Sequence, residues 1–356
     1  MAYTTINKST DYFNTLLWTG NSGNQSITGN DFTADFTWSK TRSNAESHIL
    51  MDTVRDAGTT LNQSISSNTN NAEGTLNNSS TLTVNSTGFD LAGTSGGTLN
   101  YTGYTYATWL WRAGGHTGSS NTDGSINTTA TSVNTTSGFS ISTYTGTGSA
   151  GTIGHGLGVA PAMIIAKRLN APAESWIVYH QSLDASAPQD KYLHLNTTDA
   201  VGDSAGMWND TAPTSSVFSV GTSTSVNQGG GTFVAYCFAE KKGFSKFGSY
   251  TGNGNADGSF IYTGFKPAFV MIKRINTSEN WFMFDNKRSP FNLISKYLVA
   301  DGTGTDSNAD FCDFVSNGYK IKVSNASFNE SGSTYIYLAF AESPIVSSNG
   351  VPATAR

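Results

Sequence analysis

The 356-residue chain has only 13% charged residues and a formal net charge of −5, so it lacks the basic excess that neutralises nucleic-acid phosphates. It shows no basic stretch followed by an apolar segment and no run of about eighteen apolar residues, so neither a secretory signal nor membrane insertion is expected. The 38 glycines and the abundance of Ser, Thr and Asn disfavour long helices and predict strands joined by many turns.

The chain opens with a polar arm, residues 1–16, which docks on the first domain or elsewhere. Then Phe36 and Trp38 alternate with polar residues, the pattern of a strand with one buried face. Residues 47–57 suit either a second strand or a short helix. The stretch 59–86 is so poor in large apolar residues that we expect loops or exposed edge strands there, not core.

Residues 114–137 contain almost no large apolar side chain, which predicts a linker or a long surface excursion. A second run of strands begins at Phe139. Its apolar segment 163–166 is predicted to be buried on both faces. Pro161 precedes this segment and Pro267 precedes a matching one, where a missing N–H and a fixed φ suit the entry to a strand.

One motif occurs three times, at residues 19–52, 145–180 and 251–285, with a lysine at the same place in each copy: Lys40, Lys167 and Lys273. The period of roughly 100 residues is the size of a whole domain. We therefore divide the chain into repeat 1 (17–113), the linker or excursion (114–137), repeat 2 (138–243), repeat 3 (244–345) and a C-terminal tail (346–356).

Each repeat offers several short strands with Gly- and Asn-rich connections, which predicts an all-β fold of three tandem antiparallel β-sandwich, jelly-roll-like repeats. A propeller is the alternative, but its blades are shorter. The same strands supply the expected core, which comprises Phe36, Trp38, Ile165, Trp176, Phe238, Phe269, Met271, Trp281 and Phe340. The two cysteines, Cys237 and Cys312, are expected to be buried thiols and not a disulfide.

The recurring elements are a YTG opening, a GxxP turn before an apolar run ending in KR, a WxxY or WxxF strand, KYL, and a closing aromatic strand followed by AG or AE. They resemble repeats of tail and tail-fibre-associated structural proteins of marine bacteriophages. Repeat 1 departs from the pattern, with Ala34 where the other copies carry Pro. The resemblance implies a virion structural protein of the tail, made in the host cytoplasm, with no catalytic residues to carry over.

The residues give little sign of catalysis. The five histidines are scattered and no GxSxG motif is present, so no nucleophile triad is predicted. Asp190, Asp203 and Asp210 are near enough in sequence to suggest a glycosidase pair, although loop carboxylates are common. The glycine-rich segments are not followed by a helix, which favours hairpin turns over phosphate loops. No metal site and no cofactor are predicted, although Asp301, Asp306 and Asp310 could offer oxygen ligands to calcium.

Trp208 is the best candidate for ligand binding. It lies in a segment without apolar alternation, beside Asn209 and Asp210. An exposed indole could contact the apolar face of a sugar while the amide and the carboxylate bind its hydroxyls. The alternative is that the ring folds back over the core.

Together these features favour a non-enzymatic tail or tail-fibre protein that acts in assembly or host attachment, with host surface glycans as a candidate ligand. Its partners would be other virion proteins and further copies of itself, with a trimer expected by analogy with fibrous tail proteins. The alternatives are a tail-borne enzyme that degrades polysaccharide and a capsid decoration protein.

Overall fold

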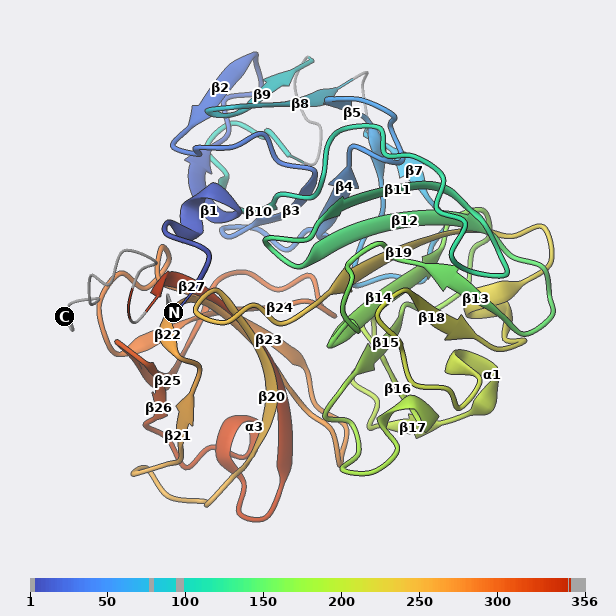
Figure 1. The fold of residues 1–356 in the computed structure, drawn as a ribbon. Coiled ribbons are helices and arrows are strands. Elements are labelled where there is room, and N and C mark those ends of the chain that lie inside the picture. The colour runs from blue at the N-terminus through green and yellow to red at the C-terminus, as the bar shows by residue number, and fades with distance from the viewer. Residues whose placement is uncertain (1–3, 77–79, 94–98, 345, 347–356) are drawn as a thin grey trace.

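The computed structural model describes residues 4–76, 80–93, 99–344 and 346. Its sheets are antiparallel, which confirms the all-β class and gives a sandwich-like arrangement of layers. The helical elements of the described chain are single turns: η1 (Ser9–Asp11), η3 (Pro188–Asp190), α1 (Ala205–Trp208), α2 (Thr224–Asn227) and α3 (Ala326–Asn329). Figure 1 shows three groups of strands around a common centre. We call these groups blocks 1, 2 and 3 in chain order.

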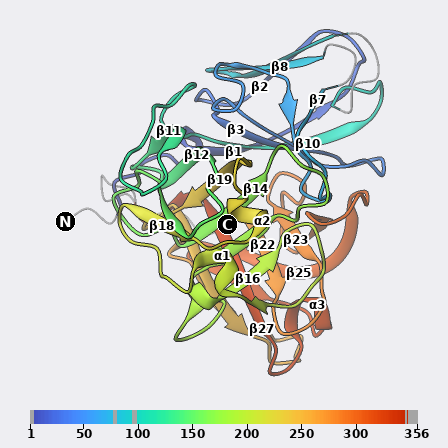
Figure 2. The ribbon, with the colours of Figure 1, turned by 90° about the vertical axis from the view of Figure 1, so that its right-hand side faces the viewer.

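Block 1 consists of two four-stranded sheets and a small hairpin. The sheet order is β1-β10-β3-β4 facing the centre and β2-β9-β8-β5 outside it, at the top of Figures 1 and 2. The strands are β1 (Phe13–Thr19), β2 (Gln25–Thr28), β3 (Phe36–Thr41), β4 (Ile49–Asp52), β5 (Thr60–Leu61), β6 (Gln63–Ser64), β7 (Gly74–Thr75), β8 (Thr81–Asn85), β9 (Gly88–Ala92) and β10 (Thr105–Trp111).

Block 2 has one large sheet, in the order β11-β12-β19-β14-β15-β16-β17, with the pair β13-β18 as its second layer. The strands are β11 (Thr128–Asn134), β12 (Phe139–Thr145), β13 (Gly151–Gly154), β14 (Met163–Arg168), β15 (Ile177–His180), β16 (Lys191–His194), β17 (Gly202–Asp203), β18 (Val217–Val220) and β19 (Thr232–Phe238).

Block 3 is a single eight-stranded sheet that folds back on itself, in the order β20-β27-β22-β23-β24-β25-β26-β21. The strands are β20 (Ser245–Thr251), β21 (Phe260–Tyr262), β22 (Phe265–Arg274), β23 (Trp281–Asp285), β24 (Ile294–Val299), β25 (Ser307–Val315), β26 (Gly318–Ile321) and β27 (Thr334–Pro344).

The same strand order occurs in the central sheet of every block: β1-β10-β3-β4, β12-β19-β14-β15 and β20-β27-β22-β23. The register agrees as well, because Lys40, Lys167 and Lys273 face Ala107, Val234 and Ile336 of the closing strands. This recurrence is what the repeated motifs would produce. Superposition of whole blocks is a further prediction that strand order alone does not test.

Three sequence-based expectations can be compared with the described strands. Residues 47–57 contain the strand β4, not a helix. The segment 114–137 supplies β11, which pairs with β12 at the edge of block 2, so it is not wholly a linker or excursion. The stretch 59–86 was expected to stay out of the core, and this is wrong. Its few apolar side chains point inward and are buried: Leu61, Ile65, Leu76, Leu82 and Val84.

The central sheets bury both faces. Along β19, Val234, Tyr236 and Phe238 point to a core that all three blocks share. The alternate residues Phe233, Ala235 and Cys237 instead pack within block 2. The same division holds along β14 and β22, as expected when successive strand side chains point to opposite faces. All nine residues predicted as core lie in the shared cluster, so that prediction is confirmed.

The blocks are tied to one another by a ring of equivalent polar contacts. A side chain at the start of each fourth strand hydrogen-bonds a backbone carbonyl of another block through its ring N–H. The pairs are His48 Nε2 with Val299 O (2.9 Å), Trp176 Nε1 with Ser66 O (2.9 Å) and Trp281 Nε1 with His194 O (2.9 Å). The contacts run from block 1 to block 3, from block 2 to block 1 and from block 3 to block 2, so the ring is closed.

The ends of the fourth strands make a second ring. Asp52 binds Arg55 in an ion pair that is fully buried, and it accepts a hydrogen bond of 2.8 Å from the hydroxyl of Tyr236 in block 2. In block 3, the pair Asp285 and Arg288 likewise receives the indole N–H of Trp109, at 3.2 Å. Block 2 has a neutral version, in which His180 Nε2 lies 3.1 Å from the carbonyl oxygen of Tyr337. Burial lowers the pKa of His180 to about 4, which keeps it uncharged at neutral pH.

The three equivalent lysines are almost completely buried, with Lys167 and Lys273 at 0% exposure and Lys40 at 1%. Each ammonium donates to backbone carbonyls, and that of Lys273 reaches Thr198 of block 2 at 2.8 Å. Burial lowers the pKa of all three to about 8. Lys40 and Lys167 therefore satisfy carbonyl groups of their own blocks, Lys273 satisfies one of block 2, and none of the three is a surface charge.

The N-terminal arm docks at the junction of blocks 2 and 3. Ile6 is buried in the shared core, and the ring of Tyr12 packs edge-on against Phe244 at 5.9 Å. A Cβ on Gly243 would lie 3.0 Å from that of Thr4 and 3.3 Å from that of Pro344, so both ends of the described chain meet there. In the described part, no helix is long and apolar enough to cross a membrane.

The buried contact between blocks 1 and 2 should depend on one hydroxyl. Tyr236→Phe removes the donor to Asp52 and leaves a buried carboxylate short of a partner, so the free energy of unfolding should fall by about 1–3 kcal/mol. Chemical denaturation measures this loss. Tyr297→Phe is the control, because that half-buried ring makes aromatic contacts alone and the change should stay within about 0.5 kcal/mol. Equal, small losses in both variants would contradict the role of the Tyr236 hydroxyl.

Asp301 should be a weak point at alkaline pH. Its Oδ1 accepts the backbone N–H of Trp281 (2.9 Å), as Asn68 does for His48 and Asn196 for Trp176. Burial raises the pKa of Asp301 to about 6, above its unfolded value, so its contribution to stability is lost as pH rises through 6. We expect Asp301→Asn to raise the free energy of unfolding at pH 8 by about 1–3 kcal/mol.

The gain from Asp301→Asn should disappear near pH 4, where the native carboxyl is protonated. Denaturation at both pH values tests this. Asn196→Asp is the matched reverse change and should destabilise the protein at pH 8. A gain that is independent of pH would show that ionisation of Asp301 is not the cause.

Candidate functional site

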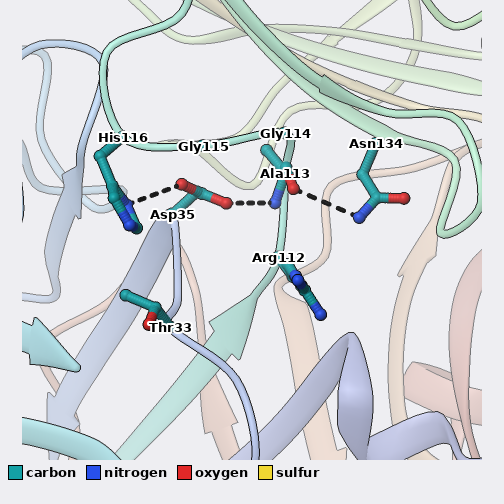
Figure 3. A pocket seen from close by; sticks show the side chains of 8 residues that line it. All are labelled: Thr33, Asp35, Arg112, Ala113, Gly114, Gly115, His116 and Asn134. Atoms are coloured by element: carbon teal, nitrogen blue, oxygen red, sulfur yellow. Dashed lines mark hydrogen bonds and ion pairs between the residues drawn. The ribbon is translucent and has the colours of Figure 1, made fainter. Parts of the chain in front are cut away.

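A polar cavity of about 280 Å³ lies at the connection between blocks 1 and 2 (Figure 3). It lies between the start of β3, the end of β10 and the segment that leads to β11. The side chains that line it combine a carboxylate, an imidazole, a guanidinium, a hydroxyl and an amide. The lining residues are Thr33, Asp35, Arg112, Ala113, Gly114, Gly115, His116 and Asn134.

Asp35 is the buried centre of this cavity. In the strand register it corresponds to Ala162 and Ala268 of the other blocks, because Phe36, Met163 and Phe269 face equivalent closing residues. Its backbone N–H binds Trp111 O at 2.9 Å, as the N–H of Ala162 binds Phe238 O at 2.7 Å. The strand entry therefore needs only a small residue, and the carboxylate is an addition of block 1.

The carboxylate fixes the chain as it leaves β10. Its Oδ2 accepts the backbone N–H of Ala113 at 2.7 Å, and its Oδ1 accepts the hydroxyl of Thr53 at 3.1 Å. His116 Nδ1 lies 3.3 Å from Oδ1, as Figure 3 shows. Burial raises the pKa of Asp35, while His116 and the hydrogen bonds act in the opposite direction. A side chain that anchors the turn thus also holds an imidazole at the cavity.

The chemistry that this arrangement can perform is limited. A His–Asp pair can hold a base in one orientation, but a nucleophile must lie within reach of it. Thr33 is the only side-chain hydroxyl in the lining, and Figure 3 shows it apart from the imidazole. Cleavage of a glycosidic bond needs two carboxyl groups, and the lining contains one. The cavity is therefore better suited to holding a small polar molecule than to catalysis.

Neither Asp35 nor His116 stands out as a site residue in the sequence. The available signal was Asp35 itself, an acidic residue next to Ala34 at a strand entry where the other copies have alanine. His116 lies in a segment that reads as a linker. No local pattern joins the two, because the turn after β10 is what brings them together.

Trp208 is not the exposed ring that the sequence suggested. It ends α1, whose first turn is capped by Ser204, and its side chain is only 2% exposed. The indole packs edge-on against Tyr179 and Phe218, with ring centres 6.1 and 6.4 Å away. Asn209 and Asp210 have positive φ and are exposed.

The three candidate side chains therefore do not converge on one ligand, and the indole face is not available for a sugar. The reason is that the single helical turn and its left-handed C-cap point the ring back into the core of block 2. That core is incomplete without it, because the β13-β18 layer covers only part of the large sheet.

Three of the other candidate carboxylates, those of Asp203, Asp301 and Asp306, have structural partners. Asp301 accepts a hydrogen bond from the backbone N–H of Trp281. Asp306 forms ion pairs with Arg42 of block 1 and Arg288 of block 3. Asp203 pairs with Lys191 at the surface. Within the described ranges no group of three or more His, Cys, Asp or Glu could hold a metal ion. His155 is fully buried, where Nδ1 accepts the N–H of Leu157 at 3.1 Å.

The cysteines lie where the sequence placed them. Cys237 and Cys312 are free and buried in the separate cores of blocks 2 and 3, which confirms the expectation of buried thiols. Burial raises the pKa of both thiols, so they stay protonated and unreactive at neutral pH.

A family model described as a domain of unknown function, DUF7483, matches residues 8–344, which span all three blocks. The chain belongs to the DUF7483 family. No curated protein and no solved structure matches it. The DUF7483 match begins before η1 and ends with β27, so the family is defined over the interlocked body and not over one block.

The burial of the indole gives a direct test of its role. Trp208→Ala should lower the free energy of unfolding by about 3–5 kcal/mol, because it empties a core site. Trp208→Phe should cost less, since it keeps most of the apolar contact and removes an indole N–H that has no partner. Phe260→Ala is the surface control, with a ring that is 46% exposed. A loss below about 1 kcal/mol for Trp208→Ala would place the ring outside the core.

Proposed function

We propose that this DUF7483 chain is a non-enzymatic structural protein of a bacteriophage virion, a tail or tail-fibre component that acts in assembly or host attachment. The motifs that resemble tail-associated repeats support the biological setting. The structural observation that carries the proposal is the closed ring of three blocks around one aromatic core. Because the three blocks share one core, none of them has to move separately. The loops between the strands extend from this rigid framework.

Partners and self-association follow from the same proposal. The composition gives few charges that would prevent pairing at sheet edges, and an edge strand such as β21 could be covered by tail proteins or by further copies. A trimer is the assembly that we propose. Surface glycans of the host are the proposed ligands of the exposed loops, whose weak individual sites would gain from repetition on the particle.

A polysaccharide-degrading enzyme of the tail is the second candidate. The observation in its favour is the polar cavity with Asp35 and His116. The single carboxylate in that lining speaks for the non-enzymatic function, because both glycosidase mechanisms use a pair. A capsid decoration protein would share the architecture and differ only in its place on the particle.

The test is to purify virions of a phage that encodes this chain, identify their proteins by mass spectrometry and locate the chain by electron cryo-microscopy. We expect it on the tail, in a copy number divisible by three. Location on the head would favour the decoration protein. Absence from purified particles would overturn the proposal, and release of reducing ends from host polysaccharide by the purified chain would favour the enzyme.

A further inference from the structure

Phe291 is the most exposed large apolar side chain in the described part of the protein, at 81%. It lies in the loop between β23 and β24, on the rim of a cavity of about 280 Å³ in block 3. A single exposed apolar residue is ordinary on a protein surface. Here, however, the ring stands beside a concave site. The other lining residues are Lys266, Asn286, Ser289, Pro290, Asn292, Ile294 and Phe314.

The loop that carries Phe291 is held firmly on both sides. Asn292 next to it forms two hydrogen bonds of 2.9 Å with the backbone of Phe314, one as donor and one as acceptor. Ser289 Oγ accepts the N–H groups of Ser295 and Lys296 at 3.3 and 3.0 Å. The ring is therefore presented from an ordered base, and a ligand that stacks on it need not pay for ordering the loop.

Asn286 contributes to the wall of this cavity and carries an unpaired amide oxygen. Its backbone N–H binds the carbonyl of Ala268 at 2.9 Å, which fixes the residue. Its side-chain Oδ1 is buried and has no hydrogen-bond partner. Leaving a buried amide oxygen unpaired costs about 1–3 kcal/mol, so this oxygen would gain from a ligand donor that displaces the groups now covering it. The carboxamide also carries an N–H₂ group, so it can accept from one hydroxyl and donate to the next.

The cavity offers no unpaired charge. Lys266 Nζ lies 2.6 Å from Glu342 Oε2, so the ammonium at the lining is neutralised by a carboxylate. A charged ligand would have to break this pair or remain uncompensated. An uncharged molecule with an apolar face and several hydroxyls matches the exposed ring and the free carboxamide better than an anion or a cation does.

We propose that this cavity binds a neutral hexose unit of a glycan, with the C–H face of the sugar against Phe291 and its hydroxyls on Asn286. This cavity takes the place of Trp208 as the candidate sugar-binding site. The inference deepens the proposed attachment function and rests on it only for the source of the glycan, the host surface. The binding itself can be measured on the isolated protein.

The experiment compares wild-type protein with three variants by affinity electrophoresis and calorimetry, using dextran, mannan and galactan as neutral probes and polygalacturonate as the anionic one. We expect wild type to bind at least one neutral polysaccharide. Phe291→Ala should weaken that binding at least about 10-fold, which corresponds to about 1.4 kcal/mol. Asn286→Ala should weaken it several-fold. Phe260→Ala, which truncates another exposed phenylalanine of block 3, should bind as wild type does.

Thermal melting of each variant shows whether the fold is intact, which is expected for Phe291→Ala because its ring is largely in solvent. Equal binding by wild type and Phe291→Ala, preference for polygalacturonate, or no binding to any neutral probe would each overturn the site. These failures are distinct from failure of the proposed function, which depends on where the chain lies in the virion. A chain found on the tail that binds no glycan would keep its structural role and lose this site.

Discussion

The three blocks are held together by one aromatic core at the centre of the molecule. Each central sheet sends alternate side chains to this core and the intervening ones to its own second layer. A block taken alone would expose rings such as Trp111, Phe238 and Phe340, which pack on one another across block boundaries at 5.8–6.4 Å. Burial of apolar area is the main source of stability, so the three blocks depend on one another in spite of their recurring strand order.

Polar contacts between the blocks specify how the blocks are arranged around this core. An apolar centre specifies poorly which faces meet, whereas buried polar groups are costly unless each finds its partner. The ring N–H groups of His48, Trp176 and Trp281 and the pairs at Asp52 and Asp285 find theirs only when the blocks sit in this arrangement. The neutral His180 shows that the charge is dispensable at one of the three boundaries, while a hydrogen bond to the neighbouring block is kept there too.

The blocks differ in the side chains near the start of the third strand of the central sheet, which is β3 in block 1 and β22 in block 3. Thr33 and Asp35 precede β3 in block 1, while Lys266 and Ala268 stand at the matching positions of block 3. The first pair borders the cavity with His116, and the second borders the cavities around Asn286. The register of the residues that follow is the same in both cases, with Phe36 opposite Trp111 and Phe269 opposite Phe340. A fixed frame with different side chains at equivalent openings allows one architecture to hold different ligands.

The all-β class, the recurring strands and the core residues could be predicted from the sequence. Alternation along Phe36 and Trp38, and the aromatic ends of the closing strands, are local patterns set by the period of a strand. The sequence also placed the two cysteines in buried strands. It could not decide which way an isolated residue points, since Trp208 and Phe291 both lie in segments without alternation and one is 2% exposed while the other is 81% exposed.

The orientations of Trp208 and Phe291 and the two cavities depend on packing between distant parts of the chain. Asp35 meets His116 because a turn after β10 folds back over a strand entry, and Asn286 borders a cavity because β22 and β24 bring Lys266 and Ile294 to it. The low-complexity stretch 59–86 contributes a few leucines, an isoleucine and a valine to the core. Its largely polar composition did not indicate that these side chains would be buried. In each case the deciding contact joins residues far apart in the chain, and such contacts leave no periodic trace in the sequence.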